Sequence, residues 1–456
     1  MEHLQTTEKV HDELLLHRRV DLLLRTGKLL VESLADTNRV VRNMKRTAAF
    51  LGIPEEKLHI NVSFTMLMVN VSDGDYSFTK FQRIDGHGVN MTAISAVSKL
   101  SWRAIENDYT LDQYEEELEE IRKRKRNYTP WQVAVGAGFA CGGFCIQFGC
   151  DWVAFLYASI AAIIGMRVRA KCNESGLNHY MGIAIAAFIS TMLAWASTLL
   201  PASWTTTLWH PLLACALFIV PGVPLINFVD DMLDNYIQVG IVRAVNTLLM
   251  VSAMAFGIAF AVKICHIENF FPTISMVPHH NYIEYAIAAA ISAMGFSMIF
   301  NIPRRLLWVV AIGGIIAVCT RNFVNLGPST DNIGLDMGLV IGSFAGSVLV
   351  SLIAIKAVHW FHCPNHVLTI PSVIPMIPGV LMYRMLFGII NMNVESPEQI
   401  SILMKAIQSG ITSGMVILCI SLGVAIPNIF GRKYIAKEKN KRLKEILAER
   451  LSLIHI

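Results

Sequence analysis

Apolar blocks follow one another from residue 130 to residue 430 and constrain the fold more than any other feature. Hydrophobic residues make up 54% of the chain and charged residues 16%, whereas ordinary soluble domains contain about 25% charged residues. Several blocks approach the roughly 20 residues that a helix needs to cross a bilayer. The sequence therefore predicts a mainly α protein, a polytopic helical membrane bundle with a small soluble α+β N-terminal domain.

The apolar blocks divide into about ten helical spans. We place them near residues 131–148, 152–166, 180–200, 207–228, 240–264, 282–300, 306–319, 335–355, 366–390 and 402–430. With this count, the basic clusters at 122–126, 167–171, 304–305 and 432–433 share one side of the membrane. Cytoplasmic loops carry an excess of Lys and Arg, so both termini are expected in the cytoplasm.

The soluble part of the chain combines a helical pattern with a strand pattern. Leucines recur on one helical face between residues 11 and 50. Apolar and polar residues alternate from Leu58 to Val71, which is typical of a strand, and residues 76–84 read as the return strand. A further helix is predicted from Asn90 to Ile105.

The predicted domain boundaries follow from these patterns. They are 1–129 for a cytoplasmic α+β domain with a basic linker helix, 130–265 for a first five-helix membrane repeat, 282–430 for a second, and 431–456 for a basic cytoplasmic tail.

Each half of the membrane region contains a proline-broken span in fourth place. The two segments read FIVPGVPLINFVDD, residues 218–231, and TIPSVIPMIPGVLMYR, residues 369–384. Five spans per half would give the halves opposite orientations, which is the inverted repeat of many secondary transporters. Proline frees backbone carbonyls, and these are tolerated at membrane depth only where protein or a wet cavity satisfies them. The breaks are expected to meet at a substrate site, although prolines can also simply kink a helix.

The candidate site residues lie in these breaks or directly after them. For substrate binding they are Pro221, Gly222, Pro224, Asn227, Pro375, Pro378, Gly379 and Arg384. Arg384 offers the planar fork that binds a carboxylate. Asp230 and Asp231 are the candidates for proton coupling, because a buried carboxylate can carry a proton. The alternative is that these two acids and Asp234 form the solvated face of a loop.

Motifs for catalysis, metal binding or nucleotide binding are missing from the sequence. It contains no P-loop, no GxSxG elbow and no HExxH, and its nine cysteines show no framework spacing. We therefore expect no enzyme activity, no cofactor and no metal, and a net charge of +4 gives no sign of nucleic-acid binding. The rival hypothesis is a membrane-anchored enzyme or receptor that acts through the N-terminal domain, where His87 between two glycines is the one suggestive histidine.

Four segments resemble the bacterial threonine/serine exporter family. RIDGHGVN (83–90) and VPGVPLINFVDDML (220–233) look like its N-terminal half, and GSFAGSVL (342–349) and TIPSVIPMIPG (369–379) look like its C-terminal module. The resemblance covers roughly residues 12–428 and implies the fused two-module form.

The resemblance implies a secondary-active exporter of small polar amino acids, similar to threonine and serine, in the bacterial inner membrane. Antiport with protons would drive it. The implied partners are a small amino acid or carboxylate substrate, protons and the lipid bilayer, and a homo-oligomer is left open. Some relatives are split into two proteins and linked to succinate export, so a dicarboxylate exporter is the alternative.

Overall fold

The computed structural model describes residues 2–73, 76–199, 201, 203–267, 280–328, 332–361, 363–390 and 397–454. The chain is mainly helical, at 76%, with one small sheet. It divides into two compact units. Unit 1 comprises residues 1–125, 230–243 and 430–456, and unit 2 comprises residues 126–229 and 244–429.

Unit 1 begins with two helices that a tight turn separates. These are α1 (Glu2–Glu32) and α2 (Thr37–Phe50). Leu34 adopts a φ of 60° in the turn, and the Asp36 side chain accepts a hydrogen bond from the Arg39 backbone N–H at the start of α2. The leucine pattern predicts helix throughout this region. The helix is interrupted because Asp36 caps the start of α2, and the spacing of the leucines gives no sign of this cap.

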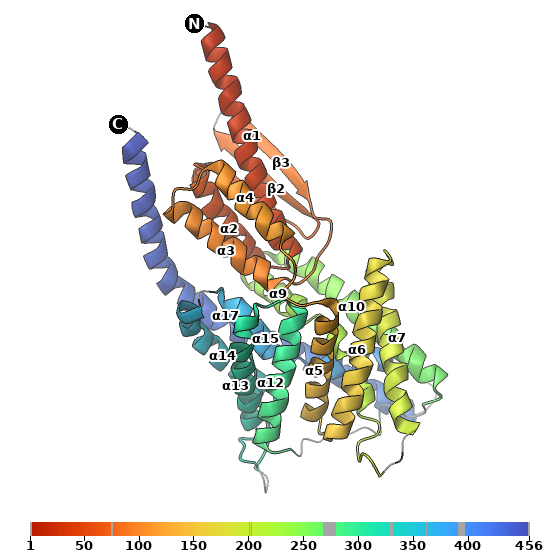
Figure 1. The fold of residues 1–456 in the computed structure, drawn as a ribbon. Coiled ribbons are helices and arrows are strands. Elements are labelled where there is room, and N and C mark those ends of the chain that lie inside the picture. Colours follow the sequence, from red (N-terminus) through yellow and green to blue (C-terminus); the bar gives the residue numbers. More distant parts are fainter. Residues whose placement is uncertain are drawn as a thin grey trace. The chain divides into compact units, whose positions relative to one another are not determined.

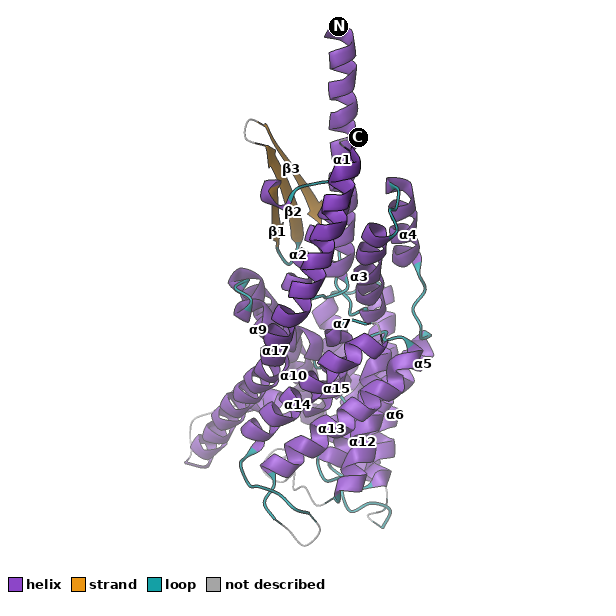
Figure 2. Ribbon diagram, turned by 90° about the vertical axis from the view of Figure 1, so that its left-hand side faces the viewer, coloured by secondary structure: helices purple, strands orange, loops and turns teal. Residues whose placement is uncertain are grey.

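A three-stranded antiparallel sheet lies beside α1 in Figure 2. Its strands are β1 (Leu58–Val62), β2 (Met66–Asp73) and β3 (Tyr76–Arg83), in the order β1-β2-β3. The segment predicted as one strand from Leu58 is therefore two strands. The hydroxyl of Ser63 accepts from the Met66 backbone N–H and donates to the Met66 carbonyl, and these bonds close the turn between them. Alternate residues of β2, Leu67 and Val69, are fully buried.

Two more helices complete the soluble core of unit 1. They are α3 (Met91–Glu106) and α4 (Leu111–Lys123). The hydroxyl of Tyr114 on α4 lies 3.0 Å from the hydroxyl of Thr26 on α1 and 3.1 Å from that of Thr47 on α2. Burial raises the pKa of Tyr114, so its hydroxyl stays protonated and these three helices share a neutral hydrogen-bonded centre.

Unit 2 is built from helices that stand side by side in Figure 1. The helices lying wholly or largely in it are α5 (Pro130–Gln147), α6 (Trp152–Glu174), α7 (His179–Ala196), α8 (Pro211–Ala214), α9 (Gly222–Leu233), α10 (Ile237–Ile264), α12 (Tyr282–Ile299), α13 (Leu307–Asn325), α14 (Leu339–Phe361), α15 (Asn365–Val373), α16 (Gly379–Ile390) and α17 (Pro397–Ile454). Short 3-10 turns lie at Ser197–Leu199, Leu217–Ile219, Arg304–Leu306 and Ile374–Met376.

Within the described parts of the chain, seven helices are long and apolar enough to cross a membrane. The number rises to nine if each of two bent helix pairs counts as one span. α5, the first predicted span, is not among them. Four glycines and two glutamines lower its hydropathy, although most of its residues are buried.

Glycines on α5 and α12 allow the two helices to pack backbone against backbone. A Cβ atom at Gly143 would lie 2.6 Å from the Ala288 carbonyl oxygen. Gly136, in the N-terminal half of α5, meets Gly295 in the C-terminal half of α12, whereas Gly143 meets Ala288 farther toward the N-terminus of α12. The two helices therefore run antiparallel. The Ser292 hydroxyl donates to the Ala140 carbonyl at 3.2 Å across this interface. Small residues permit this approach in membrane proteins.

Replacing Gly143 with alanine should destabilise the protein by roughly 1–3 kcal/mol, because the new methyl group overlaps a backbone oxygen that cannot move aside. Gly414 on α17 is the matched control, since nothing lies within 4 Å of a Cβ atom there. Gly414→Ala should be neutral or stabilising by about 0.5–1 kcal/mol, because alanine favours helix. Thermal unfolding of the purified protein in detergent measures both, and equal melting temperatures for the two variants would contradict the packing described here.

Candidate functional site at the two helix breaks

Both predicted breaks are present, and they have the same backbone geometry. The first bends by 58° between Pro211–Ile219 and Gly222–Leu233, and the second by 56° between Asn365–Met376 and Gly379–Leu386. At the first break the Gly222 N–H donates to the Val220 carbonyl at 2.8 Å. At the second the Gly379 N–H donates to the Ile377 carbonyl at 2.9 Å.

The two breaks lie against each other. A Cβ atom at Gly222 would lie 3.0 Å from Cδ1 of Ile377, and one at Gly379 would lie 2.7 Å from Cδ2 of Leu217. The Tyr383 hydroxyl on α16 donates to the Leu213 carbonyl of α8 at 2.9 Å. At each break the glycine backbone therefore packs against side chains of the other segment. The expectation that the breaks meet is correct.

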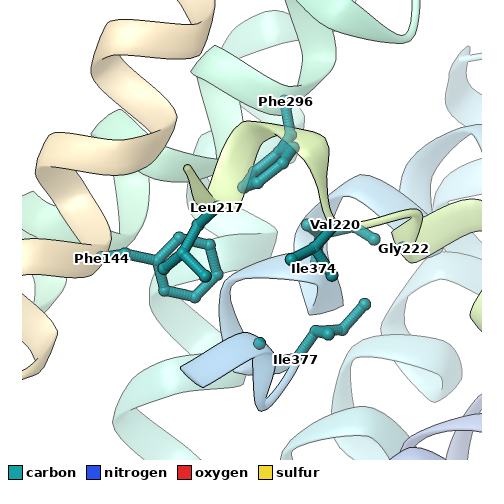
Figure 3. Close-up of a pocket in the computed structure, with 8 residues that line it drawn as sticks. Phe144, Leu217, Val220, Gly222, Phe296, Ile374 and Ile377 are labelled. Atoms are coloured by element: carbon teal, nitrogen blue, oxygen red, sulfur yellow. The ribbon is translucent and has the colours of Figure 1, made fainter. Parts of the chain in front are cut away.

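A small cavity marks this meeting point in Figure 3. Its lining consists of matched positions from the two segments, together with one phenylalanine from α5 and one from α12: Leu217 and Ile374, Val220 and Ile377, Gly222 and Gly379, Phe144 and Phe296. All are apolar. The sequences LFIVPGV and IPMIPGV place the first three pairs in the same order.

The cavity is closed to any substrate in this structure. Its volume is about 10 Å³, which is about the space that one water molecule needs. Carbonyls beside the breaks are engaged locally, since Pro221 accepts from the Leu225 N–H at 3.0 Å and Pro378 from the Met382 N–H at 3.2 Å. The breaks thus form an apolar constriction here, and the backbone groups expected to bind a substrate are occupied.

Two predicted polar residues occupy the same position after each break. Asn227 ends the sequence PGVPLIN and Arg384 ends PGVLMYR. Asn227 is buried, and Arg384 is half-buried. The predicted roles of Arg384 in substrate binding and of Asp230 in proton coupling stay predictions, because Asp230 belongs to unit 1 and Arg384 to unit 2.

Asp230 and Asp231 are buried, with 4% and 1% of their surfaces exposed, so neither is the solvated loop residue of the alternative hypothesis. Asp231 forms an ion pair with Arg243 at the start of α10, with Oδ2 and Nε 3.2 Å apart. Its Oδ1 accepts from the Thr37 backbone N–H at 2.8 Å. Arg243 also donates to the Ala35 carbonyl at 2.8 Å. One buried cluster therefore joins the α1–α2 turn to α9 and α10 within unit 1.

Sequence reasoning missed Arg243. The sequence does contain a signal for it. An Asp-Asp pair is followed by an apolar segment with one arginine near its start, and a charge at such a position needs a partner or a function. The pairing itself depends on the turn between α1 and α2, which no local pattern places near residue 231.

The His87 ring is held by packing and hydrogen bonding. Its ring stacks on Phe64 with centroids 3.9 Å apart, and its Nε2 lies 2.9 Å from the Phe64 carbonyl oxygen. Burial lowers the pKa of His87, and the charge of Arg243 lowers it further. Its loop also binds the α1–α2 turn, because the Gly88 N–H donates to the Glu32 carbonyl at 2.8 Å. A neutral, stacked imidazole at this turn supports a packing role.

Comparison with known protein families agrees with the resemblance seen in the sequence. A family model described as "Putative threonine/serine exporter" matches residues 21–265, and one described as "Threonine/Serine exporter, ThrE" matches residues 285–430. The chain belongs to the threonine/serine exporter family. Both exporter modules lie in one polypeptide, which is the fused form. The family consists of exporters, so this is a multi-pass membrane transporter with a small-molecule substrate and not an enzyme.

Two curated relatives match the first module. A "Probable succinate transporter subunit YjjP" of Klebsiella aerogenes is 24% identical over 241 residues, which are 53% of this chain and 91% of the relative. The protein of the same name in Escherichia coli K12 is 24% identical over 243 residues, 53% of this chain and 93% of the relative. No solved structure matches this exporter significantly.

Removing one member of the Asp231–Arg243 pair should be costly. Arg243→Gln leaves a buried carboxylate without its cation and should lower the free energy of unfolding by about 3–5 kcal/mol. The matched control is Arg18→Gln, because Arg18 pairs with Asp112 and Glu115 at the surface, where such pairs contribute about 0–1 kcal/mol.

A double-mutant cycle isolates the pair. The double variant Asp231→Asn, Arg243→Gln should lose less stability than the sum of the single variants, because neither charge is then left alone. Chemical denaturation in detergent provides the measurement, and strictly additive losses would mean that the two side chains do not interact.

Proposed function

We propose that this chain is a secondary-active exporter of small polar amino acids, similar to threonine or serine, driven by antiport with protons. It would lie in a bacterial inner membrane with both termini in the cytoplasm. Membership in the exporter family supports this function most directly. The observation that carries the mechanism is the contact between the two broken helices, because interrupted spans in corresponding positions form the binding sites of many secondary transporters.

We further propose that the membrane region has about ten spans in two inverted five-helix repeats, with α5 as the first. Three observations support the repeat. The antiparallel packing of α5 and α12 suits helices that open two oppositely inserted halves. The two breaks share their bend and their hydrogen bonds. Matched residues line the closed cavity.

The constriction would act as the central barrier of an alternating-access cycle. In the closed state its apolar lining excludes water and ions, and rocking of one repeat against the other would open it to each side in turn. Opening would free the carbonyls beside Pro221 and Pro378 for the substrate's ammonium group. Asn227 and Arg384, which follow the breaks at matched positions, would then face the substrate from opposite repeats.

Proton coupling would use the acids that follow the first break. Asp230 is buried, and a buried carboxylate can exchange a proton in step with conformational change. Asp231 is held in place by its ion pair with Arg243 and by the Thr37 N–H. Asp230 is therefore the preferred proton carrier, and Asp231 would act with it by anchoring the end of α9.

The second candidate function is export of a dicarboxylate. The observation in its favour is that the two curated relatives are named as succinate transporter subunits. Their 24% identity leaves the substrate of this chain open, and the efflux experiment separates the two candidates.

Cells that produce the protein should release preloaded labelled threonine faster than cells with an empty vector. An uncoupler that collapses the proton gradient should reduce this difference at least roughly tenfold. Labelled succinate is tested in parallel. Faster release of succinate alone would select the dicarboxylate exporter, and no release of either solute would contradict both transport functions.

Asp230→Asn should abolish the response of export to the proton gradient, because an amide cannot take up the transported proton. Exchange of external for internal substrate should continue, since exchange needs no net proton movement. Asp234→Asn is the matched control from the same chain segment and should respond to the gradient like the wild type. Reconstituted vesicles with an imposed pH difference provide the measurement, and an unchanged pH response in Asp230→Asn would assign proton coupling elsewhere.

A further inference from the structure

We propose that Arg321, Asn322, Tyr285 and Gln147 form a carboxylate-binding site beside the constriction, separate from the helix breaks. The inference rests on the proposed function in one respect, which is that the occupant is the carboxylate group of the exported solute. The cluster draws on three helices of unit 2: Gln147 ends α5, Tyr285 lies in the first turn of α12, and Arg321 and Asn322 lie near the end of α13.

Among the described residues, the hydrogen-bond partners of the Arg321 guanidinium are all neutral. Its Nε and Nη2 donate to Oδ1 of Asn322 at 3.1 and 3.0 Å, and Nη2 also donates to Oε1 of Gln147 at 3.3 Å. Across the described residues, no carboxylate lies within ion-pair distance of this guanidinium. The acid nearest in sequence to Tyr285 is Glu284, and it is already engaged with the His280 ring at 2.9 Å.

The position of Arg321 makes this arrangement costly without a ligand. It lies within the candidate membrane span Arg304–Asn325. Ionisable residues within a membrane span usually serve a function or pair with another group, and this includes residues near the end of a span, where Arg321 lies. Amide oxygens satisfy the geometry of its donors but leave its charge uncompensated. A negatively charged ligand would supply the missing compensation.

Two further donors in the cluster point to the same ligand chemistry. The Nδ2 group of Asn322 is buried and has no acceptor, since the Oδ1 of the same amide is taken by Arg321. The hydroxyl of Tyr285 is also buried, and it has no hydrogen-bond partner among the described residues. The charge of Arg321 reaches this hydroxyl. Buried donors without acceptors are rare in proteins, and two beside an uncompensated cation suit an oxyanion.

The cluster lies one helical turn from the constriction. Gln147 follows Phe144, which lines the cavity at the breaks, on the same face of α5. Under the proposed topology the C-terminal end of α5 faces outward. A solute that has passed between the breaks would therefore meet the guanidinium before release. Amino acids and dicarboxylates both carry the carboxylate that these donors fit, and uncharged amino alcohols do not.

An arginine recurs at the matched position of the first half. The segment IAAIIGMRVR ends at Arg169 on α6, and IGGIIAVCTR ends at Arg321 on α13. An inverted repeat would place these two arginines at opposite mouths of the pathway. A cation at each mouth is what a carrier of carboxylates needs if both of its open states are to hold the same group.

The test measures binding to the purified full-length protein by titration calorimetry. The probes are threonine, threoninol, which replaces the carboxylate with an alcohol, and succinate. Wild type should bind threonine at least about tenfold more tightly than threoninol. Arg321→Gln should lose that preference, and Arg321→Lys should recover only part of it, because lysine lacks the planar fork.

Tyr285→Phe is the milder variant and guards against misfolding. It removes one oxygen, should keep the melting temperature of the ligand-free protein, and should weaken threonine binding about tenfold. Arg305→Gln is the matched control, because Arg305 is exposed at the other end of the same span, and it should bind threonine like the wild type.

Each result decides the inference. If succinate binds with the same dependence on Arg321, the carboxylate site is supported, and its occupant is the solute of the dicarboxylate exporter. The inference is overturned if both Arg321→Gln and Tyr285→Phe bind threonine and succinate like the wild type. It is also overturned if the wild type binds neither solute. If the wild type binds carboxylates through Arg321 but fails in the efflux assay, the site stands and the proposed export function falls.

Discussion

At Gly222 and Gly379 two broken helices approach so closely that a side chain on either would overlap the other segment. Much of unit 2 is arranged around this contact. Each segment bends there because proline prevents a continuous hydrogen-bond ladder, and each supplies an apolar turn to the other. α5 and α12 close the cavity from their own sides with Phe144 and Phe296. In the proposed mechanism, the barrier to solutes is therefore built from turns and rings, and no charged side chain lines its cavity.

Charged side chains have different surroundings in the two units. In unit 1, Asp231 and Arg243 neutralise each other in a buried cluster that also holds the α1–α2 turn. Arg321, by contrast, has only amide partners among the described residues. Arg243 is buried, and its compensated pair fixes structure. We propose, by contrast, that the half-buried Arg321, with donors nearby, is prepared for a ligand.

Local chemistry made some parts of this molecule predictable. The Pro-Gly breaks can be read from the sequence because proline and glycine act on their own backbone, and the β3 strand from Tyr76 shows its alternation directly. Tertiary partners explain the rest. The contact of Arg243 with Ala35 and that of Arg321 with Gln147 join groups far apart in the sequence. α5 also shows the limit of hydropathy, because its glycines lower its apolar score while they enable its packing.

The glycines of α5 have a consequence for how the protein is made. Gly138 and Gly142 are covered by α6, the next helix to leave the ribosome, whereas the face with Gly136 and Gly143 waits for α12. α5 therefore enters the translocon as the partner of a hairpin and finishes its assembly only after the second module has been synthesised. A chain arrested between the modules would leave this glycine face without its partner helix.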